Sequence, residues 1–208
     1  MDFLEFPKIH RLSRQVIVTE KIDGTNAQVA IFEEPELTPE SKDLALAKID
    51  GRYLFAGSRS RYLQSGDDNF GFAAWVLAHR EELAELGPGR HFGEWWGSGI
   101  QRGYGLTKGD KRFSLFNVAR WADDRDQAKY PAARPACCGV VPVLYTGMFD
   151  DFMGHVDDIM ENLKESGSWV AKGFMQPEGI VVFHTQSGLS FKKTLTKDEE
   201  HKGQHARP

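Results

Sequence analysis

Cysteine is scarce in this sequence, and its placement excludes two common kinds of site. The chain has two cysteines among 208 residues, Cys137 and Cys138, and they are neighbours. Adjacent cysteines fit neither the ligand spacing of a structural zinc site nor a disulfide framework. A reducing compartment is the natural interpretation, so we expect a cytoplasmic protein.

Long apolar runs and an excess of charge of one sign are also lacking. No stretch approaches the roughly 18 consecutive apolar residues that a membrane helix needs, and residues 1–14 have no long apolar core. The sequence therefore predicts a soluble protein with no membrane partner. The formal net charge is −4, which gives no overall sign of nucleic-acid binding but leaves room for a basic groove.

Short runs of β-branched and alternating apolar residues dominate the chain, and they predict strands. These runs cover residues 15–20, 27–32, 52–60, 90–96, 111–121, 178–184 and 189–195. Two helices are predicted, at 69–86 and 155–167; the first has Asp68 as its N-cap and ends at Gly87. A hairpin connection with a short central helix is expected at 33–51. The predicted fold class is α+β, with mostly antiparallel sheets and flanking helices.

Lys21 lies at the junction of two predicted strands, in the run Lys21-Ile22-Asp23-Gly24. In an extended backbone, residues two apart point to the same side, so Asp23 shares a face with the lysine amine. Gly24 then permits a turn or the close approach of a ligand. Most lysines are solvated surface groups. A lysine placed among carboxylates and other cations at a sheet rim can instead act as a nucleophile toward a phosphoryl group.

Further acids and lysines recur at the ends of later strands. Glu94 stands among aromatic residues, so it is either a structural carboxylate or a group that contacts a ribose or a hydrated metal. Glu178 precedes a run that should be buried. Lys192 and Lys193 follow in the next strand, where alternation lets one of them face a pocket. A solvated edge strand is the ordinary explanation of such a pair, but it does not account for the recurrence.

These residues resemble, in order, the motifs of the covalent nucleotidyltransferases, the superfamily of polynucleotide ligases and mRNA capping enzymes. The matching positions are Lys21-Ile22-Asp23-Gly24, Arg59, Phe92-Gly93-Glu94, Phe116, Glu178-Gly179 and Lys192-Lys193. Within the superfamily, Glu20 to Asn26 and Gly93 to Gln101 are most similar to the bacteriophage-type RNA ligases that seal nicks in duplex RNA. The resemblance runs from Glu20 to Lys193.

The resemblance implies an ATP-dependent RNA ligase with a nucleotidyltransferase (adenylation-domain, ATP-grasp-like) fold. Lys21 would form a lysyl-AMP intermediate, Asp23 would orient the amine or a 3′-terminal ribose, and Lys192 or Lys193 would contact the phosphate. The activated 5′-phosphate end would then be joined to a 3′-hydroxyl. Nucleotide contacts are implied for Glu20, Lys21, Ile22, Asn26, Arg59, Glu94, Phe116, Glu178 and Lys192. Glu178 would hold the water shell of Mg²⁺ or Mn²⁺.

Two departures from the family pattern bear on these roles. Asn117 stands where the family often has Asp, and the last motif reads Lys-Lys-Thr instead of Lys-x-Lys, so the resemblance does not decide which lysine meets the phosphate. A DNA nick-sealing ligase, a capping-type guanylyltransferase and a non-catalytic nucleotide-binding module stay open as alternatives. No residue visibly reads the 2′-hydroxyl that distinguishes RNA from DNA.

The expected domain organisation is a nucleotidyltransferase domain at residues 1–195 and a charged tail at 196–208, with no separate OB-fold or helical C-terminal domain. The expected partners are RNA ends, in a nicked or bridged duplex, with an oligomer or an accessory protein left open. Basic residues are expected to supply contacts to the polynucleotide, and their candidates are Arg59, Arg61, Arg102, Lys108, Lys111 and Arg112. Trp95, Trp96 and Tyr104 are expected to be core residues in preference to base-stacking ones.

Overall fold

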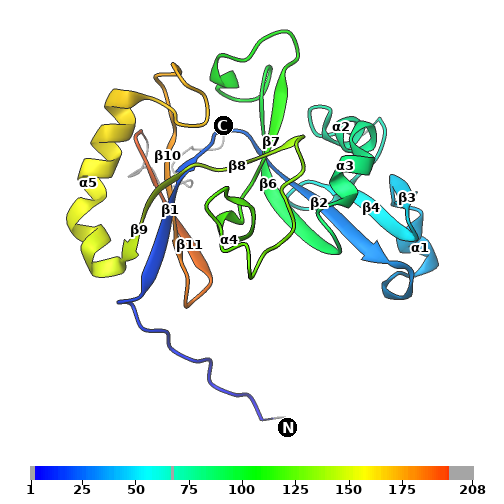
Figure 1. Cartoon of the computed structure of the whole chain (residues 1–208), viewed down its shortest axis with the longest axis horizontal. Helices are drawn as coiled ribbons and strands as arrows, with labels where there is room; N and C mark the ends of the chain where they lie inside the picture. The colour runs from blue at the N-terminus through cyan, green and yellow to red at the C-terminus, as the bar shows by residue number, and fades with distance from the viewer. Residues whose placement is uncertain (1–2, 67, 197–208) are drawn as a thin grey trace, which may run out of the picture. The chain divides into compact units, whose positions relative to one another are not determined.

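The chain folds as two compact units, each built on its own sheet. The computed structural model describes residues 3–66 and 68–196. The first unit comprises the described parts of Met1–Lys21 and Pro142–Pro208, and the second unit is Ile22–Val141. The chain therefore leaves the first unit directly after Lys21. The predicted α+β class with mostly antiparallel sheets is confirmed (Figure 1).

The first unit contains a four-stranded antiparallel sheet in the order β11-β10-β1-β9. Its strands are β1 (Gln15–Lys21), β9 (Val143–Met148), β10 (Gly179–His184) and β11 (Leu189–Thr194). One helix, α5 (Phe149–Ser166), packs on one face of this sheet, as Figure 1 shows. Its Phe152, Met160 and Leu163 meet Val18 and Ile180 in a buried core. The predicted hairpin of β10 and β11 is confirmed.

The second unit contains a larger sheet in the order β3-β4-β2-β6-β7-β8, with β5 paired to β4. Its strands are β2 (Thr25–Glu33), β3 (Ala47–Ile49), β4 (Arg52–Gly57), β5 (Tyr62–Leu63), β6 (Gly89–Gly97), β7 (Lys111–Leu115) and β8 (Cys138–Val140). Only the pairing of β7 with β8 is parallel among these ladders. Short helical turns connect them, at Glu34–Glu36, Pro39–Lys42 (α1), Gly103–Gly105 and Val118–Trp121 (α4).

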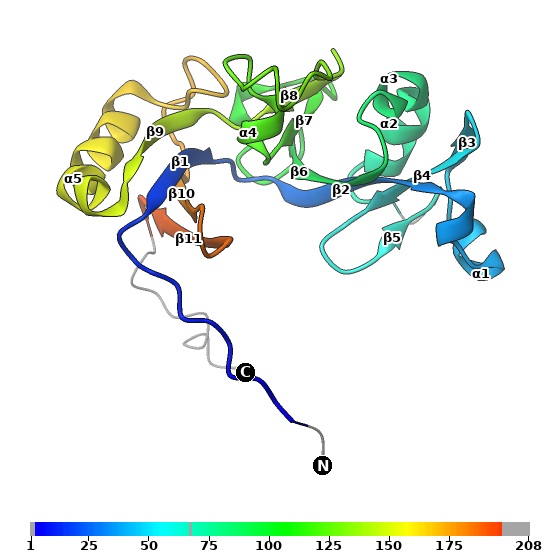
Figure 2. The same cartoon turned by 60° about the horizontal axis from the view of Figure 1, so that its bottom comes forward.

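The helix predicted at 69–86 is present as two shorter helices, α2 (Phe72–Ala78) and α3 (Arg80–Ala84), which lie on one face of the second sheet (Figure 2). The break falls at His79, whose φ of −105° and ψ of 20° are not helical. Asp68 caps α2 from outside the helix, because its carboxylate accepts hydrogen bonds from the Ala73 and Ala74 amides at 2.6 and 3.2 Å. The predicted stop at Gly87 is confirmed by its φ of +76°.

Three boundaries predicted from the sequence are wrong. The strand predicted at 52–60 ends at Gly57. The strand predicted at 111–121 ends at Leu115, because the Asn117 side chain accepts a hydrogen bond from the Arg120 amide and starts α4. The helix predicted to begin at His155 begins at Phe149, whose amide donates a hydrogen bond of 2.9 Å to the Arg14 carbonyl. Strands β8 and β9 were not predicted, because their segments have no regular apolar alternation.

Membrane-spanning helices and groups of metal ligands can be assessed in the described residues alone. Within residues 3–66 and 68–196, no helix combines the length and apolar character that crossing a bilayer requires. In the same residues, no three His, Cys, Asp or Glu side chains gather into a metal-binding group. Residues 197–208 of the predicted charged tail lie outside the described part of the chain.

Candidate active site

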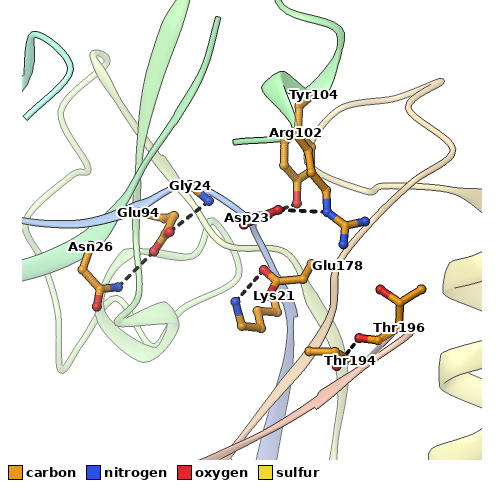
Figure 3. A network of polar contacts seen from close by, with 10 residues as sticks. All are labelled: Lys21, Asp23, Gly24, Asn26, Glu94, Arg102, Tyr104, Glu178, Thr194 and Thr196. Carbon is orange, nitrogen blue, oxygen red and sulfur yellow. Dashed lines mark hydrogen bonds and ion pairs between the residues drawn. The ribbon is translucent and has the colours of Figure 1, made fainter. Parts of the chain in front are cut away.

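Lys21 is the last residue of β1, and its amine pairs with the Glu178 carboxylate in the first unit. The Nζ to Oε2 distance is 2.5 Å, and the two side chains are 22% and 16% exposed. Glu178 directly precedes β10, whose Gly179 lies opposite Lys21 in the antiparallel ladder. Figure 3 shows the two side chains pointing toward one another. Adjacent strands therefore bring the predicted nucleophile and the predicted metal-binding acid together.

The register of the same sheet separates the two lysines of β11. Lys192 lies opposite Val181, which lies opposite Thr19, two residues before Lys21. Side chains directly opposite in a ladder share a face, and residues two apart along a strand share it too. Lys192 is therefore on the Lys21 face. Lys193 lies opposite Ile180, a core residue, and so faces the α5 side.

Glycine is required directly after Glu178 because strands β10 and β11 approach closely there. Gly179 has a φ of +153°, and a Cβ at this position would overlap the Lys193 carbonyl and the Thr194 Cα. No other residue type fits both conditions. The Glu-Gly pair of the motif therefore combines the carboxylate that pairs with Lys21 and a steric requirement of the sheet.

A chain of hydrogen bonds in the second unit joins three further predicted residues. Glu94 of β6 accepts from the Gly24 amide through Oε1 and from Asn26 Nδ2 through Oε2, each at 3.1 Å. Arg59 Nε donates to Asn26 Oδ1 at 3.0 Å. Glu94 is 8% exposed, so its carboxylate is fixed from two sides by groups of β2 and the turn before it. Figure 3 shows Glu94 between Gly24 and Asn26.

Asp23 is held by two residues that sequence reasoning did not assign to the site. Arg102 Nε donates to Asp23 Oδ2 at 2.9 Å, and the Asp23 amide donates to the Tyr104 hydroxyl at 2.8 Å (Figure 3). Arg102 was predicted only as a contact for the polynucleotide, and Tyr104 as a core residue. Tyr104 is indeed 2% exposed. The many glycines of residues 97–105 were the available signal, since they indicate an unusual backbone near the motif.

Glu20 is buried among hydrogen-bond donors of the protein itself, although the resemblance assigns it to nucleotide binding. Its carboxylate is 1% exposed and accepts hydrogen bonds from Ser168 Oγ and from the Trp169 and Val170 amides, at 2.6 to 2.9 Å. Burial raises the pKa of Glu20, and these three hydrogen bonds lower it by less. The side chain therefore anchors the segment after α5 to the strand that carries Lys21.

Phe116 follows β7 and is 41% exposed, so its ring is accessible to a planar ligand. Its amide donates to the Phe92 carbonyl at 2.9 Å. Asn117 then caps α4 through Oδ1, which accepts from the Arg120 amide at 3.1 Å. Aspartate and asparagine are equally good N-caps, so Asn117 fills the structural requirement at the position where the family often has Asp.

The remaining predicted residues divide into core and surface. Ile22, Trp95 and Trp96 are buried, and for the two tryptophans the core interpretation is confirmed. Arg59, Arg61, Lys108 and Arg112 are exposed, whereas Arg102 and Lys111 are half-buried. Arg112 pairs with Asp110 at 3.1 Å, in the loop before β7.

The α+β architecture is that of the nucleotidyltransferase domain of RNA ligases, and comparison with known proteins agrees. A sequence profile described as RNA ligase matches residues 14–197. The chain therefore belongs to the RNA ligase family. No curated protein matches it in sequence.

Several solved structures of Naegleria gruberi RNA ligase share the fold. A mutant with ATP and Mn superposes with a TM-score of 0.58 at 17% identity, over 92% of this chain and 53% of that chain. Another mutant with ATP and Mn gives 0.57 at 17% identity, over 88% and 49%. The same ligase with PPi gives 0.55 at 19% identity, over 88% and 50%. The chain spans about half the length of these structures, and the likeness shows the fold.

Proposed function

We propose that this protein is an ATP-dependent RNA ligase that works through a covalent Lys21–AMP intermediate. The observation that carries the proposal is the placement of Lys21 at the end of β1. Its amine lies 2.5 Å from the Glu178 carboxylate, and Lys192 occupies the same face of the sheet. A nucleophilic amine, an acid and a second cation in this arrangement suit attack on a phosphate. The family and the fold support the same reaction.

In the first step, Lys21 Nζ attacks the α-phosphorus of ATP. An N–P bond forms, the bond from phosphorus to the bridging oxygen breaks, and pyrophosphate leaves. The attacking amine must give up a proton, and the Glu178 carboxylate is an acceptor within hydrogen-bond distance. Lys192 would stabilise the negative charge that develops on the non-bridging oxygens. Little covalent work falls to other groups, so the protein acts mainly by positioning.

The resemblance also assigns nucleotide contacts to residues of the second unit. Glu94 would accept from the ribose hydroxyls, which suits a carboxylate whose position is fixed by hydrogen bonds from Gly24 and Asn26. Asn26 and Arg59, which are bonded to one another, would support Glu94 and contact phosphate. Phe116 would stack on the adenine, which suits its exposed ring.

A divalent cation fits the acids present without a dedicated cage. Mg²⁺ keeps several of its waters and often binds through one or two carboxylates. Glu178 is the partly exposed carboxylate next to the nucleophile, so we assign it to the hydrated Mg²⁺ or Mn²⁺. The metal would supply charge neutralisation on the phosphates.

In the later steps, the AMP passes to a 5′-phosphate end, and a 3′-hydroxyl displaces it to form a phosphodiester. An oxygen of the 5′-phosphate forms a bond to the AMP phosphorus, the bond from that phosphorus to Lys21 breaks, and the amine nitrogen regains a proton. The bond to AMP breaks second, and the hydroxyl proton leaves with the formation of the new ester. Asp23 would orient the amine or the terminal ribose. The substrate proposed here is a nicked or bridged RNA duplex.

The test of the first step is intact-mass analysis after incubation with ATP and Mg²⁺ or Mn²⁺. We expect a mass increase of one AMP in the wild-type chain and in Lys164→Ala, which removes an exposed lysine of α5. Lys21→Ala should show none. An adduct on another lysine, or no adduct across a range of pH values with both metals, would overturn the proposal.

The test of the later steps is sealing of labelled nicked duplexes that contain RNA, DNA or one strand of each. Sealing of nicked RNA with ATP is expected. A preference for DNA nicks would favour the DNA ligase alternative, and adduct formation with GTP in place of ATP would favour the guanylyltransferase. An adduct without any sealing would restrict the function of this chain to nucleotide transfer.

A further inference from the structure

The segment between β6 and β7 adopts a backbone that is costly for most residues. Gly97, Gly99, Gly103 and Gly105 all have positive φ angles, which glycine tolerates. Gln101 and Tyr104 also have positive φ angles, of 42° and 50°. A non-glycine residue in this region is uncommon, and a bulky one is a sign of strain or of a requirement elsewhere. The positive φ angle of Tyr104 is therefore costly for the loop, and contacts with residues outside the loop are needed to maintain it.

Packing fixes the Tyr104 ring in this conformation. The side chain is 2% exposed, and its ring meets the Trp96 ring edge-on at a centroid distance of 5.3 Å. Trp96 is fixed in turn by a hydrogen bond of 2.9 Å from its Nε1 to Ser114 Oγ. The Tyr104 hydroxyl is consequently held at one point, where it accepts from the Asp23 amide.

Arg102 reaches the same residue from the same loop. Its Nε donates to the Asp23 carboxylate at 2.9 Å, with side chains 30% and 26% exposed. The loop thus contacts Asp23 twice, once at the main chain and once at the side chain (Figure 3). A main-chain contact sets the path of the turn after β1, and the ion pair sets the rotamer of the carboxylate.

We propose that Arg102 and Tyr104 are positioning residues, which fix the Asp23 carboxylate and main chain for the transfer of AMP to and from Lys21. The inference rests on the proposed function and adds to it two residues from outside the ligase motifs. Asp23 is two residues from Lys21 in the chain. A freely rotating carboxylate would occupy several rotamers, and only some of them would suit the reaction. Asp23 is fixed at its side chain by Arg102 and at its main-chain amide by Tyr104, so it is already oriented for the reaction.

The variants that test this are Tyr104→Phe and Arg102→Gln. The first removes only the hydroxyl and keeps the ring against Trp96. The second keeps a long polar side chain and removes the charge. Tyr62→Phe is the matched control for the tyrosine, because the Tyr62 hydroxyl also takes part in a hydrogen bond, from Arg90 at 3.1 Å. Arg80→Ala is the control for the arginine, since Arg80 forms an exposed pair with Glu81.

The measurement is the single-turnover rate of Lys21–AMP formation as a function of ATP concentration. Both variants should lower the maximal rate by about tenfold, the equivalent of one hydrogen bond. The ATP concentration for half-maximal rate should stay unchanged, because Asp23 is assigned no contact with the nucleotide. Adding Arg102→Gln to Asp23→Asn should cause no further loss, since the two residues act as a unit.

Two results would overturn the inference. One is a wild-type protein that forms the adduct while both variants react as fast as their controls. The other is a rate loss of Arg102→Gln that is undiminished in the Asp23→Asn background. If the wild-type protein forms no adduct, the proposed function fails by itself. The contact between Asp23 and Arg102 is then tested by urea unfolding of the wild type, Arg102→Gln, Asp23→Asn and the double variant. If the two substitutions change the free energy of unfolding additively, the residues are not coupled and the positioning role is also rejected.

Discussion

Lys193 Nζ lies 3.6 Å from Asp157 Oδ1, so this lysine is engaged with α5 on the covered side of the first sheet. Its neighbour Lys192 is exposed and lies on the opposite face, with Lys21. The alternation of β11 is regular over Gly179 to His184 of the partner strand, with no bulge in the register. The two lysines of the last motif therefore have different surroundings.

We predict that Lys192→Ala abolishes Lys21–AMP formation, whereas Lys193→Ala retains most of it. Lys192 is on the face where a phosphate bound at Lys21 would lie, while Lys193 contributes an exposed ion pair that is worth little. The measurement is adduct yield by intact mass under identical conditions. Equal losses in the two variants would show that the face assignment does not decide the function of this pair.

Glu20→Gln should destabilise the protein by roughly 1–3 kcal/mol at acidic to neutral pH. The carboxylate accepts three hydrogen bonds through its two oxygens, and an amide has one acceptor oxygen, so at least one buried donor loses its partner. Urea unfolding of both proteins measures the difference. Lys164→Ala, an exposed change in α5, should leave the unfolding midpoint nearly unchanged.

The pH dependence of this difference has a definite sign. The pKa of Glu20 is raised from 4.5 in the folded protein, so the folded state favours the protonated form. The contribution of Glu20 to stability is then fully present below about pH 4.5 and is lost as the pH rises through the folded-state pKa. The wild-type advantage over Glu20→Gln should therefore shrink from pH 5 to pH 8. An advantage that grows over this interval would contradict the raised pKa.

The sequence predicted the strands that carry Lys21, Lys192 and Lys193 well, because strand alternation is a local property. The run from Gln15 to Glu20 reads as a strand from its β-branched residues, and β1 includes these residues and ends at Lys21. The hairpin of β10 and β11 follows from Gly188 and the flanking apolar runs. Where pattern and spacing are sufficient, the prediction and the structure agree.

What the sequence could not supply depends on contacts between distant residues. The pairing of Arg102 with Asp23 joins positions 79 residues apart, and no periodicity indicates such a contact. The helical start at Phe149 likewise depends on the Arg14 carbonyl. The division of residues 1–195 into two compact units was not predicted, because the boundary after Lys21 falls inside a motif and carries no linker composition.

Asn117→Asp should preserve both stability and adenylylation, whereas Asn117→Ala should cost about 1 kcal/mol. The side chain caps α4, and either an amide or a carboxylate oxygen can accept from the Arg120 amide. Loss of the cap would also loosen Phe116, the neighbouring residue proposed to stack on adenine. Thermal unfolding and the ATP dependence of adduct formation measure the two effects. Better adduct formation in the aspartate variant than in the wild type would instead indicate a direct function for a carboxylate here.

Gly24→Ala should destabilise the second unit by about 1–3 kcal/mol or more, although Gly24 does not have a positive φ angle. The sequence suggested a turn or the approach of a ligand, but the structure gives a different reason. A Cβ on Gly24 would overlap the Trp95 carbonyl oxygen and lie 2.8 Å from the Trp96 Cβ, where β2 enters the sheet beside β6.

The matched control is Gly154→Ala, at an exposed helical position of α5 where an added Cβ meets nothing within 4 Å. Alanine is favoured over glycine in a helix, so this variant should be stabilised by about 0.5–1 kcal/mol. Urea unfolding, monitored by tryptophan fluorescence, compares the two. Because the Gly24 amide donates to Glu94 at 3.1 Å, a backbone displaced by the new Cβ should also weaken ATP binding. A Gly24→Ala protein as stable as the wild type would mean that β2 and β6 can separate at little cost, and that the glycine of the motif serves the ligand after all.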